Sequence, residues 1–215
     1  MNRSRKTQTI AAKWEKKSNV PLAVIGFMYL AVYSIQVVYR QDVALVSQLE
    51  FVSIVIWIIF AIDVIFRIIS SSGFMIFLKN NWLEILALSL PFLRILRVFR
   101  ALIALRGMKG FFQSRANATG AYVAMLLPLT WFTGAIAVLD AESSNPSALI
   151  TNLREALWWS LSTITTVGYG DKYPTTVEGE LVAAVLMITG IALFSASAGI
   201  FASWILSEKR KSSAT

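Results

Sequence analysis

The chain has 215 residues, of which 56% are hydrophobic and only 15% are charged, and its formal net charge is +8. This balance is typical of a multi-pass membrane protein, and the basic residues gather between apolar stretches, which indicates membrane loops rather than a nucleic-acid-binding face. Cysteine and histidine are both absent, so a disulfide, a thiolate metal site and the commonest general base are ruled out. This alone does not exclude an enzyme, although we expect neither an enzyme nor a nucleic-acid partner.

Two apolar runs in the first third of the chain have the length of membrane spans. Residues 20–39 make about 30 Å of helix, which is one bilayer core. The basic arm before this run, residues 1–19, predicts a cytoplasmic N-terminus and has no cleavage site of a removable signal peptide. The second run, residues 49–69, carries Asp63 and Arg67 four positions apart on one face, and charges at that depth need a partner or water.

Residues 82–105 allow two interpretations. They can form one tilted span, or two segments, 82–92 and 93–105, of which the first is only about 16 Å of helix. Two segments that meet outside are favoured, because Pro91 breaks a helix at the junction, although no glycine or asparagine eases the turn there. A single span would also place the cations that follow it outside, against the charge bias of membrane loops.

The last hundred residues predict a pore of two spans with a re-entrant segment between them. Residues 119–139 and 181–206 are long enough to cross, and the basic tail from residue 208 is expected in the cytoplasm. Residues 140–152 form a polar, acidic outer loop. Residues 153–165 are apolar but too short to cross, so we expect a re-entrant helix, which is tolerated only where protein or an aqueous cavity surrounds it.

A glycine-rich run, TTVGYGD at residues 165–171, follows this short segment. Gly168 and Gly170 can take backbone angles that are closed to other residues. A strand that alternates such residues with larger ones can turn successive carbonyls the same way, and this row of oxygens can replace the water around a monovalent cation. The Thr166 hydroxyl can add one more oxygen. The alternative is a glycine-rich turn between two membrane helices.

The run and its flanks, ALWWSLSTITTVGYGDKYP, resemble the selectivity filter of potassium channels, and the chain resembles the compact bacterial type within the voltage-gated superfamily. The resemblance implies an all-α fold of six transmembrane helices. It divides them into a sensor-like four-helix bundle at residues 20–115 and a two-helix pore with a re-entrant helix at residues 116–207. One filter strand cannot enclose an ion, so we expect a homotetramer in the cell membrane, in contact with membrane lipids.

The resemblance also assigns roles around the filter. The K⁺-coordinating positions, through backbone carbonyls and the Thr166 hydroxyl, are Thr166, Val167, Gly168 and Tyr169. The filter is supported by Thr165, Gly170, Asp171, Trp158 and Trp159. In the family the tryptophan pair packs as a cuff in which the indole at Trp158 bonds the acid at Asp171, whereas a plain interface belt is the alternative. Ser162 stands where one bacterial channel type has a buried glutamate, which leaves the inactivation behaviour open.

Two further pore positions are implied. Gly190 matches the hinge glycine of the family's gate, with close helix packing as the alternative, and residues 197–199 replace the Pro-x-Pro kink of animal channels. Tyr173 lies beyond the filter, where four aromatic rings are expected to bind external tetraethylammonium. Lys172 complicates this blocker site, because four ammonium groups would repel the blocker unless solvent screens them.

The first half of the chain resembles a voltage-sensor domain. In that family the second helix carries an aromatic, an acid and an arginine, here Phe60, Asp63 and Arg67. The third helix carries an asparagine and an acid, here Asn81 and Glu84. The fourth carries cations at every third position, here Arg94, Arg97 and Arg100, with Ile103 at the next place, then Arg106 and Lys109. These cations are expected to sense voltage, and the alternative is that they fix topology or bind lipid phosphates.

We therefore expect passive, potassium-selective conduction with opening biased by membrane voltage. The alternative within the class is a potassium channel whose sensor-like domain is static, either lipid-gated or constitutively open. Outside the class, the alternatives are a non-conducting membrane scaffold and a transporter. A transporter predicts an inverted repeat with broken helices in both halves, and only one half of this sequence carries such a break.

Overall fold

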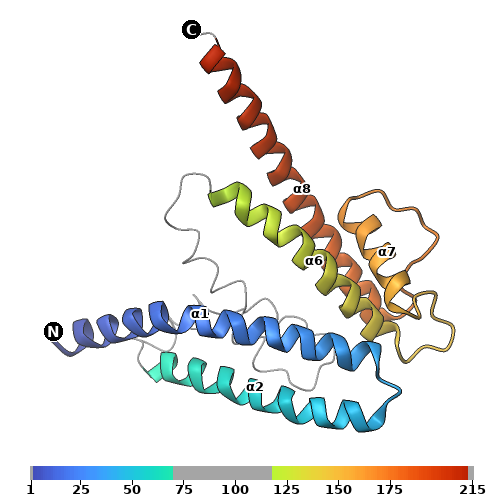
Figure 1. Ribbon diagram of the computed structural model, residues 1–215, viewed down its shortest axis with the longest axis horizontal. Coiled ribbons are helices and arrows are strands. Elements are labelled where there is room, and N and C mark those ends of the chain that lie inside the picture. Colours follow the sequence, from blue (N-terminus) through green and yellow to red (C-terminus); the bar gives the residue numbers. More distant parts are fainter. Residues whose placement is uncertain (1, 70–117, 213–215) are drawn as a thin grey trace. The chain divides into compact units, whose positions relative to one another are not determined.

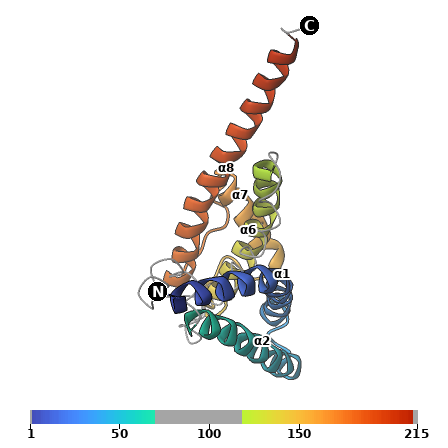
Figure 2. The same ribbon diagram turned by 90° about the vertical axis from the view of Figure 1, so that its left-hand side faces the viewer.

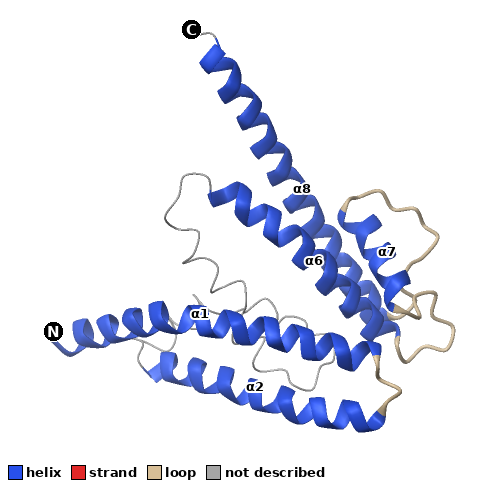
Figure 3. Cartoon of the chain, viewed as in Figure 1, coloured by secondary structure: helices blue, strands red, loops and turns tan. Residues whose placement is uncertain are grey.

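The computed structural model describes residues 2–69 and 118–212, and the chain divides into two compact units, Met1–Phe111 and Phe112–Thr215. Within the described ranges all regular structure is helical, as expected for an all-α protein (Figure 3). The predicted segments at 82–92 and 93–105 lie outside these ranges. So do the predicted sensor residues Glu84, Arg94, Arg97, Arg100, Arg106 and Lys109.

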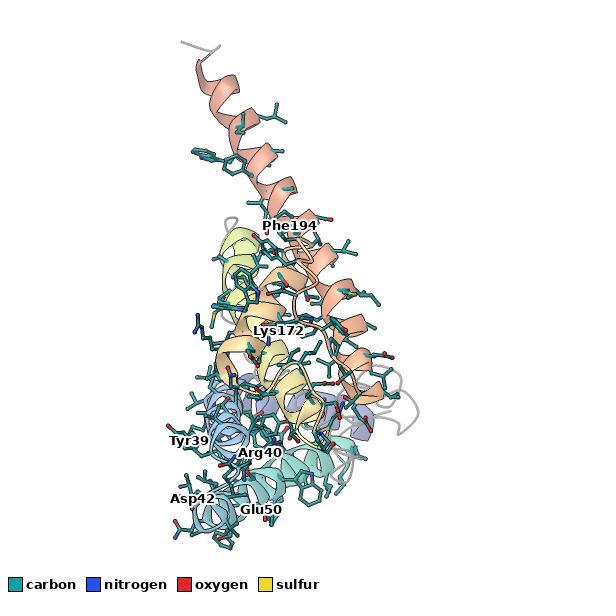
Figure 4. The ribbon with its side chains drawn as sticks, turned by 90° about the vertical axis from the view of Figure 1, so that its right-hand side faces the viewer. Tyr39, Arg40, Asp42, Glu50, Lys172 and Phe194 are labelled. Carbon is teal, nitrogen blue, oxygen red and sulfur yellow. The ribbon has the colours of Figure 1, made fainter. Side chains whose placement is uncertain are left out.

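In the first unit, α1 (Asn2–Val38) and α2 (Val43–Ile69) pack against each other as an antiparallel pair (Figure 1). A tight turn joins them, in which the Asp42 N–H donates to the Tyr39 carbonyl oxygen at 2.9 Å (Figure 4). The Asp42 carboxylate then accepts the Leu45 N–H at 3.0 Å, as an N-cap does. This cap explains why α2 begins six residues before the apolar run at residue 49.

Aromatic and aliphatic side chains fill the contact between α1 and α2. Tyr29 and Tyr33 of α1 are buried and stack with ring centroids 6.2 Å apart. From α2, Ile56, Phe60 and Val64 are also buried, at the spacing of one helical face. That buried face of α2 is the one that carries the predicted sensor residues.

In the second unit, α6 (Ala118–Glu142) and α8 (Val177–Ser212) pack along each other, and the short α7 (Leu153–Ile164) packs against both (Figure 2). The approach of α6 to α8 is close, because a Cβ at Gly134 would lie 2.9 Å from a Leu186 methyl carbon. At 12 residues α7 is about 18 Å long, too short to cross a bilayer core. This is the length expected of a re-entrant helix.

Among the described residues, four helices are long and apolar enough to cross a membrane: Val20–Val38, Val43–Ile69, Val123–Glu142 and Val177–Leu206. Each corresponds to one of the predicted spans. The helices themselves run further than the apolar stretches, since backbone hydrogen bonding does not stop where composition changes. The 36 residues of α8 make about 54 Å of helix, so α8 extends well beyond one bilayer core.

A buried carboxylate joins the end of α6 to the start of α8. Glu142 is only 1% exposed and accepts the backbone N–H groups of Thr175 at 2.9 Å and Thr176 at 2.8 Å. Both threonine hydroxyls donate to the same carboxylate. Because a Cβ at Gly179 would lie 2.5 Å from a Glu142 oxygen, glycine is needed at this position for the helix ends to meet.

Candidate ion-selectivity filter

The helix α7 positions the glycine-rich run that follows it. Its N-cap is Asn152, whose side-chain oxygen accepts the Glu155 N–H at 3.1 Å. At the other end Thr165 is the C-cap, and its hydroxyl donates to the Leu161 carbonyl oxygen at 2.7 Å. The helix is also tied to α6, because the Trp131 indole N–H donates to the Leu157 carbonyl oxygen at 2.9 Å. The caps of α7 and its hydrogen bond to α6 therefore hold the first residue of the run in place.

The backbone of the run alternates in handedness. Thr166, Gly168 and Gly170 have φ angles of +61°, +58° and +75°, whereas Val167 and Tyr169 between them do not have positive φ. Glycine adopts this conformation freely, but for threonine it costs about 1–2 kcal/mol, so the surrounding contacts must hold Thr166 in place. Alternation of this kind is the backbone geometry that turns successive carbonyls toward one side.

Amide groups at the inner end of the run donate back into α7. The Ser162 carbonyl oxygen accepts the Val167 N–H at 2.9 Å and the Gly168 N–H at 3.1 Å. Because the N–H and C=O of a trans peptide point in opposite directions, the carbonyls of Thr166 and Val167 face away from α7. Within the described part of the chain, no hydrogen bond reaches the carbonyl oxygens of residues 166–169. These oxygens are available to a ligand.

Aromatic side chains brace the outer end of the run. The Trp158 indole N–H donates to the Asp171 carboxylate at 2.8 Å, the hydrogen bond that the resemblance implies. The Trp158 ring also stacks on Tyr169, with centroids 5.1 Å apart. Trp159 is buried in the core of the unit. The two tryptophans thus contact different surroundings, Trp158 the run and Trp159 the interior.

Ser162 has a role that the sequence did not reveal. It is buried, and its hydroxyl donates to the Trp159 carbonyl oxygen at 2.9 Å within α7. Its own carbonyl oxygen is the acceptor for two amides of the run, as described above. The backbone of this position, rather than its side chain, supports the inner end of the run.

Gly190 lies where α8 meets the end of α7. A Cβ at this position would lie 2.8 Å from the Ile164 carbonyl oxygen and 3.0 Å from the Ile164 Cα. The helix α8 runs without interruption through Gly190 and through residues 197–199. Close packing, the alternative considered for this glycine, accounts for these distances, and its role as a gate hinge stays a prediction.

An ion pair between Lys172 and Glu155 joins the segment that follows the run to α7. The Lys172 ammonium donates to the Glu155 carboxylate and to the Leu149 carbonyl oxygen, each at 2.9 Å. The other Glu155 oxygen accepts the N–H and hydroxyl of Thr151 at 2.8 and 3.0 Å. The Thr151 N–H and then Lys172 lower the pKa of Glu155 to about 2. Tyr173, next in sequence, is 54% exposed.

The sequence contained only a partial signal for this pair. Asn152 followed three residues later by Glu155 is the pattern of a capping box, which marks a helix start. Here the glutamate reaches one residue further back, to Thr151, and this frees its second oxygen for Lys172. Nothing in the pattern predicts the lysine, which lies 17 positions along the chain.

In the first unit, α2 brings together three of the predicted sensor residues. Phe60, Asp63 and Arg67 are all buried, and Arg67 Nε donates to an Asp63 carboxylate oxygen at 2.9 Å. Burying two charges is costly unless they pair, so the ion pair accounts for their presence on an apolar helix.

Comparison with known proteins identifies the family. A family model described as an ion channel matches residues 125–207. A voltage-gated potassium channel of Aeropyrum pernix is 31% identical over 199 residues, and the match covers 80% of this chain and 67% of that protein. The chain belongs to the voltage-gated potassium channel family. It is accordingly a multi-pass membrane protein of an ion-channel family, not an enzyme.

Longer channel proteins also match parts of the chain. The voltage-gated potassium channel regulatory subunit KCNG3 of Homo sapiens is 30% identical over 128 residues, which are 54% of this chain and 29% of that protein. The potassium voltage-gated channel subfamily KQT member 3 of Homo sapiens is 42% identical over 65 residues, which are 30% of this chain and 8% of that protein. The chain therefore spans less than a third of the length of either human relative.

Proposed function

We propose that four copies of this chain form a potassium-selective channel in the cell membrane, with both termini in the cytoplasm and opening biased by voltage. The observation that carries the proposal is the filter backbone: alternate residues with positive φ, amides donating into α7, and carbonyls without a hydrogen-bond partner among the described residues. Carbonyl oxygens arranged in this way substitute for the hydration shell of K⁺. The coordinating residues are Thr166, Val167, Gly168 and Tyr169.

The same geometry supports a tetramer. A single row of carbonyls contacts an ion from one side only, so several rows must surround it. Val167 and Tyr169 are 57% and 65% exposed in one chain, although they lie in an apolar part of the sequence. Neighbouring copies around a fourfold axis would cover these side chains and close the ring of oxygens.

Voltage dependence is supported by the first unit. The buried Asp63–Arg67 pair with Phe60 gives α2 an acid at membrane depth, which can partner a mobile cation. The predicted fourth helix supplies cations at every third position, and the Aeropyrum pernix relative is named a voltage-gated channel.

The test is a current–voltage record from the purified chain in a planar lipid bilayer between unequal K⁺ and Na⁺ solutions. We expect currents that reverse near the potassium equilibrium potential and that activate with voltage. Equal permeability to Na⁺, or no current with or without another subunit, would reject the filter. Because one relative is named a regulatory subunit, the chain is tested alone. Current only after addition of another subunit would reject the homotetramer.

A further inference from the structure

A lysine follows the filter run directly. Lys172 follows Asp171, so a homotetramer carries four ammonium groups close to the outer end of its filter. Ammonium groups that faced the exit would lower the local K⁺ concentration, since like charges repel over about 10 Å at 0.1 M salt. The position of the Lys172 side chain therefore bears on conduction.

Contacts of Lys172 place its charge on the α7 side of the filter. Its ammonium is bound by Glu155, in the first turn of α7, and by the Leu149 carbonyl oxygen before that helix. The carbonyls of Thr166 and Val167 face away from α7, as argued above from the amides bound to Ser162. The ammonium and these carbonyls thus lie on opposite sides of the same strand.

Glu155 is itself held from several directions. Its backbone N–H donates to the Asn152 side chain, and one carboxylate oxygen accepts two hydrogen bonds from Thr151. These bonds fix the carboxylate and leave its other oxygen directed at Lys172. The lowered pKa of Glu155 means that the group is ionised throughout the physiological pH range.

We propose that Glu155 is a positioning residue of the outer mouth, which holds the ammonium of Lys172 behind the filter and away from the ion path. The inference rests on the proposed function, because it concerns the ions that pass. Loss of the carboxylate leaves Lys172 with a single carbonyl partner, Leu149, and frees four charges to approach the exit. Inward current then falls, most of all at low ionic strength.

The experiment is a double-mutant cycle on unitary inward K⁺ current at low and high ionic strength. In the wild-type background we expect Glu155→Gln to lower this current about threefold at low ionic strength, and the current to recover at high ionic strength. In the Lys172→Met background the same change should lower it by less than about 1.5-fold, because no ammonium remains to be released. Glu178→Gln, an exposed acid at the start of α8, is the matched control for loss of one charge and should have only the smaller effect.

The outcomes separate this inference from the proposed function. Absence of K⁺ current in the wild type rejects the channel, whereas a conducting wild type with the same fold-change for Glu155→Gln in both backgrounds rejects only the positioning role. Lys172→Met alone supplies a second test if Glu155→Gln does not assemble. An ammonium held behind the filter predicts a rise of less than about 1.5-fold, and a rise of about threefold or more would mean that Lys172 already faces the exit.

Discussion

At the scale of single residues, the candidate filter depends on backbone conformations that most side chains resist. Thr166, Gly168 and Gly170 adopt positive φ within five positions, and only two of these are glycine. The hydrogen bonds of Val167 and Gly168 to Ser162, together with the Trp158–Asp171 bond, clamp the run at both ends. Strain at Thr166 is therefore sustained by its neighbours, as is common at functional sites.

Replacing Gly168 by alanine tests this dependence. The φ of +58° costs an L-residue with a Cβ about 1–2 kcal/mol, and in a tetramer four methyl groups would crowd the axis. We expect the Gly168→Ala protein to assemble without passing K⁺, measured as flux into liposomes. Gly120→Ala in α6 is the control, because a Cβ there would lie 3.6 Å from Ile200 Cγ2, an ordinary van der Waals distance. Normal potassium selectivity in Gly168→Ala would end the filter assignment.

Tyr173 is expected to form an external blocker site. Its side chain is more than half exposed, and the ion pair with Glu155 removes the repulsion that Lys172 would otherwise impose on a quaternary ammonium. An aromatic face contributes about 0.5–1 kcal/mol to binding of such a cation at exposed sites. Dose–response curves should therefore show weaker block by external tetraethylammonium in Tyr173→Val, with ion selectivity kept. Equal sensitivity would exclude the ring from the site.

Low pH is expected to lower the stability of the folded chain through protonation of the Glu155 carboxylate. Its pKa in the folded chain is about 2, below the ordinary value of 4.5, so its contribution to stability is present above pH 4.5 and is lost as the pH falls toward 2. The wild type is expected to melt at a higher temperature than Glu155→Gln at pH 7. This gap should narrow between pH 4.5 and 2 in thermal unfolding of the purified protein. A gap that does not change with pH would contradict the assigned hydrogen bonds.

At the scale of elements, the position of α7 against α8 determines where the candidate filter lies. The Gly190 contact with Ile164 brings two helix backbones together at the point where α7 ends and the run begins. Any movement of α8 at this level would press on the end of α7. We therefore expect packing and gating to be linked at Gly190, whichever of the two is its main role.

The Gly190→Ala variant tests this contact. The added methyl meets backbone atoms of Ile164, which cannot swing aside as a flexible side chain can, and overpacking of this kind costs about 1–3 kcal/mol. We expect a lower dissociation temperature of the tetramer and altered filter behaviour, such as faster loss of current during a sustained step. Gly120→Ala in α6, where the added Cβ would lie at ordinary contact distance from Ile200, should change neither. Normal stability with a shift only in gating would instead support the hinge.

At the scale of the whole molecule, sequence patterns predicted the elements better than the contacts between them. Apolar length located the four spans of the described ranges, and the TVGYG signature located the candidate filter. Contacts between residues that are far apart in the chain produce no periodic pattern in the sequence. Examples are the bonds of Glu142 to Thr175, 33 positions away, and of Lys172 to Glu155, 17 positions away. Helices begin at other residues than the apolar pattern predicts, because capping residues such as Asp42 determine where they start.

In the proposed tetramer, voltage sensing would be a property of the whole assembly, because it would sum charge over four chains. Each unit charge that crosses the full potential contributes about 2.3 kcal/mol per 100 mV, so Arg94, Arg97 and Arg100 in four subunits can supply at most about 28 kcal/mol per 100 mV. Removing one arginine per chain lowers this maximum by a third. We therefore expect Arg97→Gln and Arg100→Gln to reduce the steepness of the conductance–voltage curve, measured in bilayers, without changing ion selectivity. Arg154→Gln, an exposed cation of α7, is the control and should leave the steepness unchanged. Unchanged steepness in both sensor variants would leave these arginines as topology or lipid-binding residues, and the channel would then open independently of the predicted fourth helix.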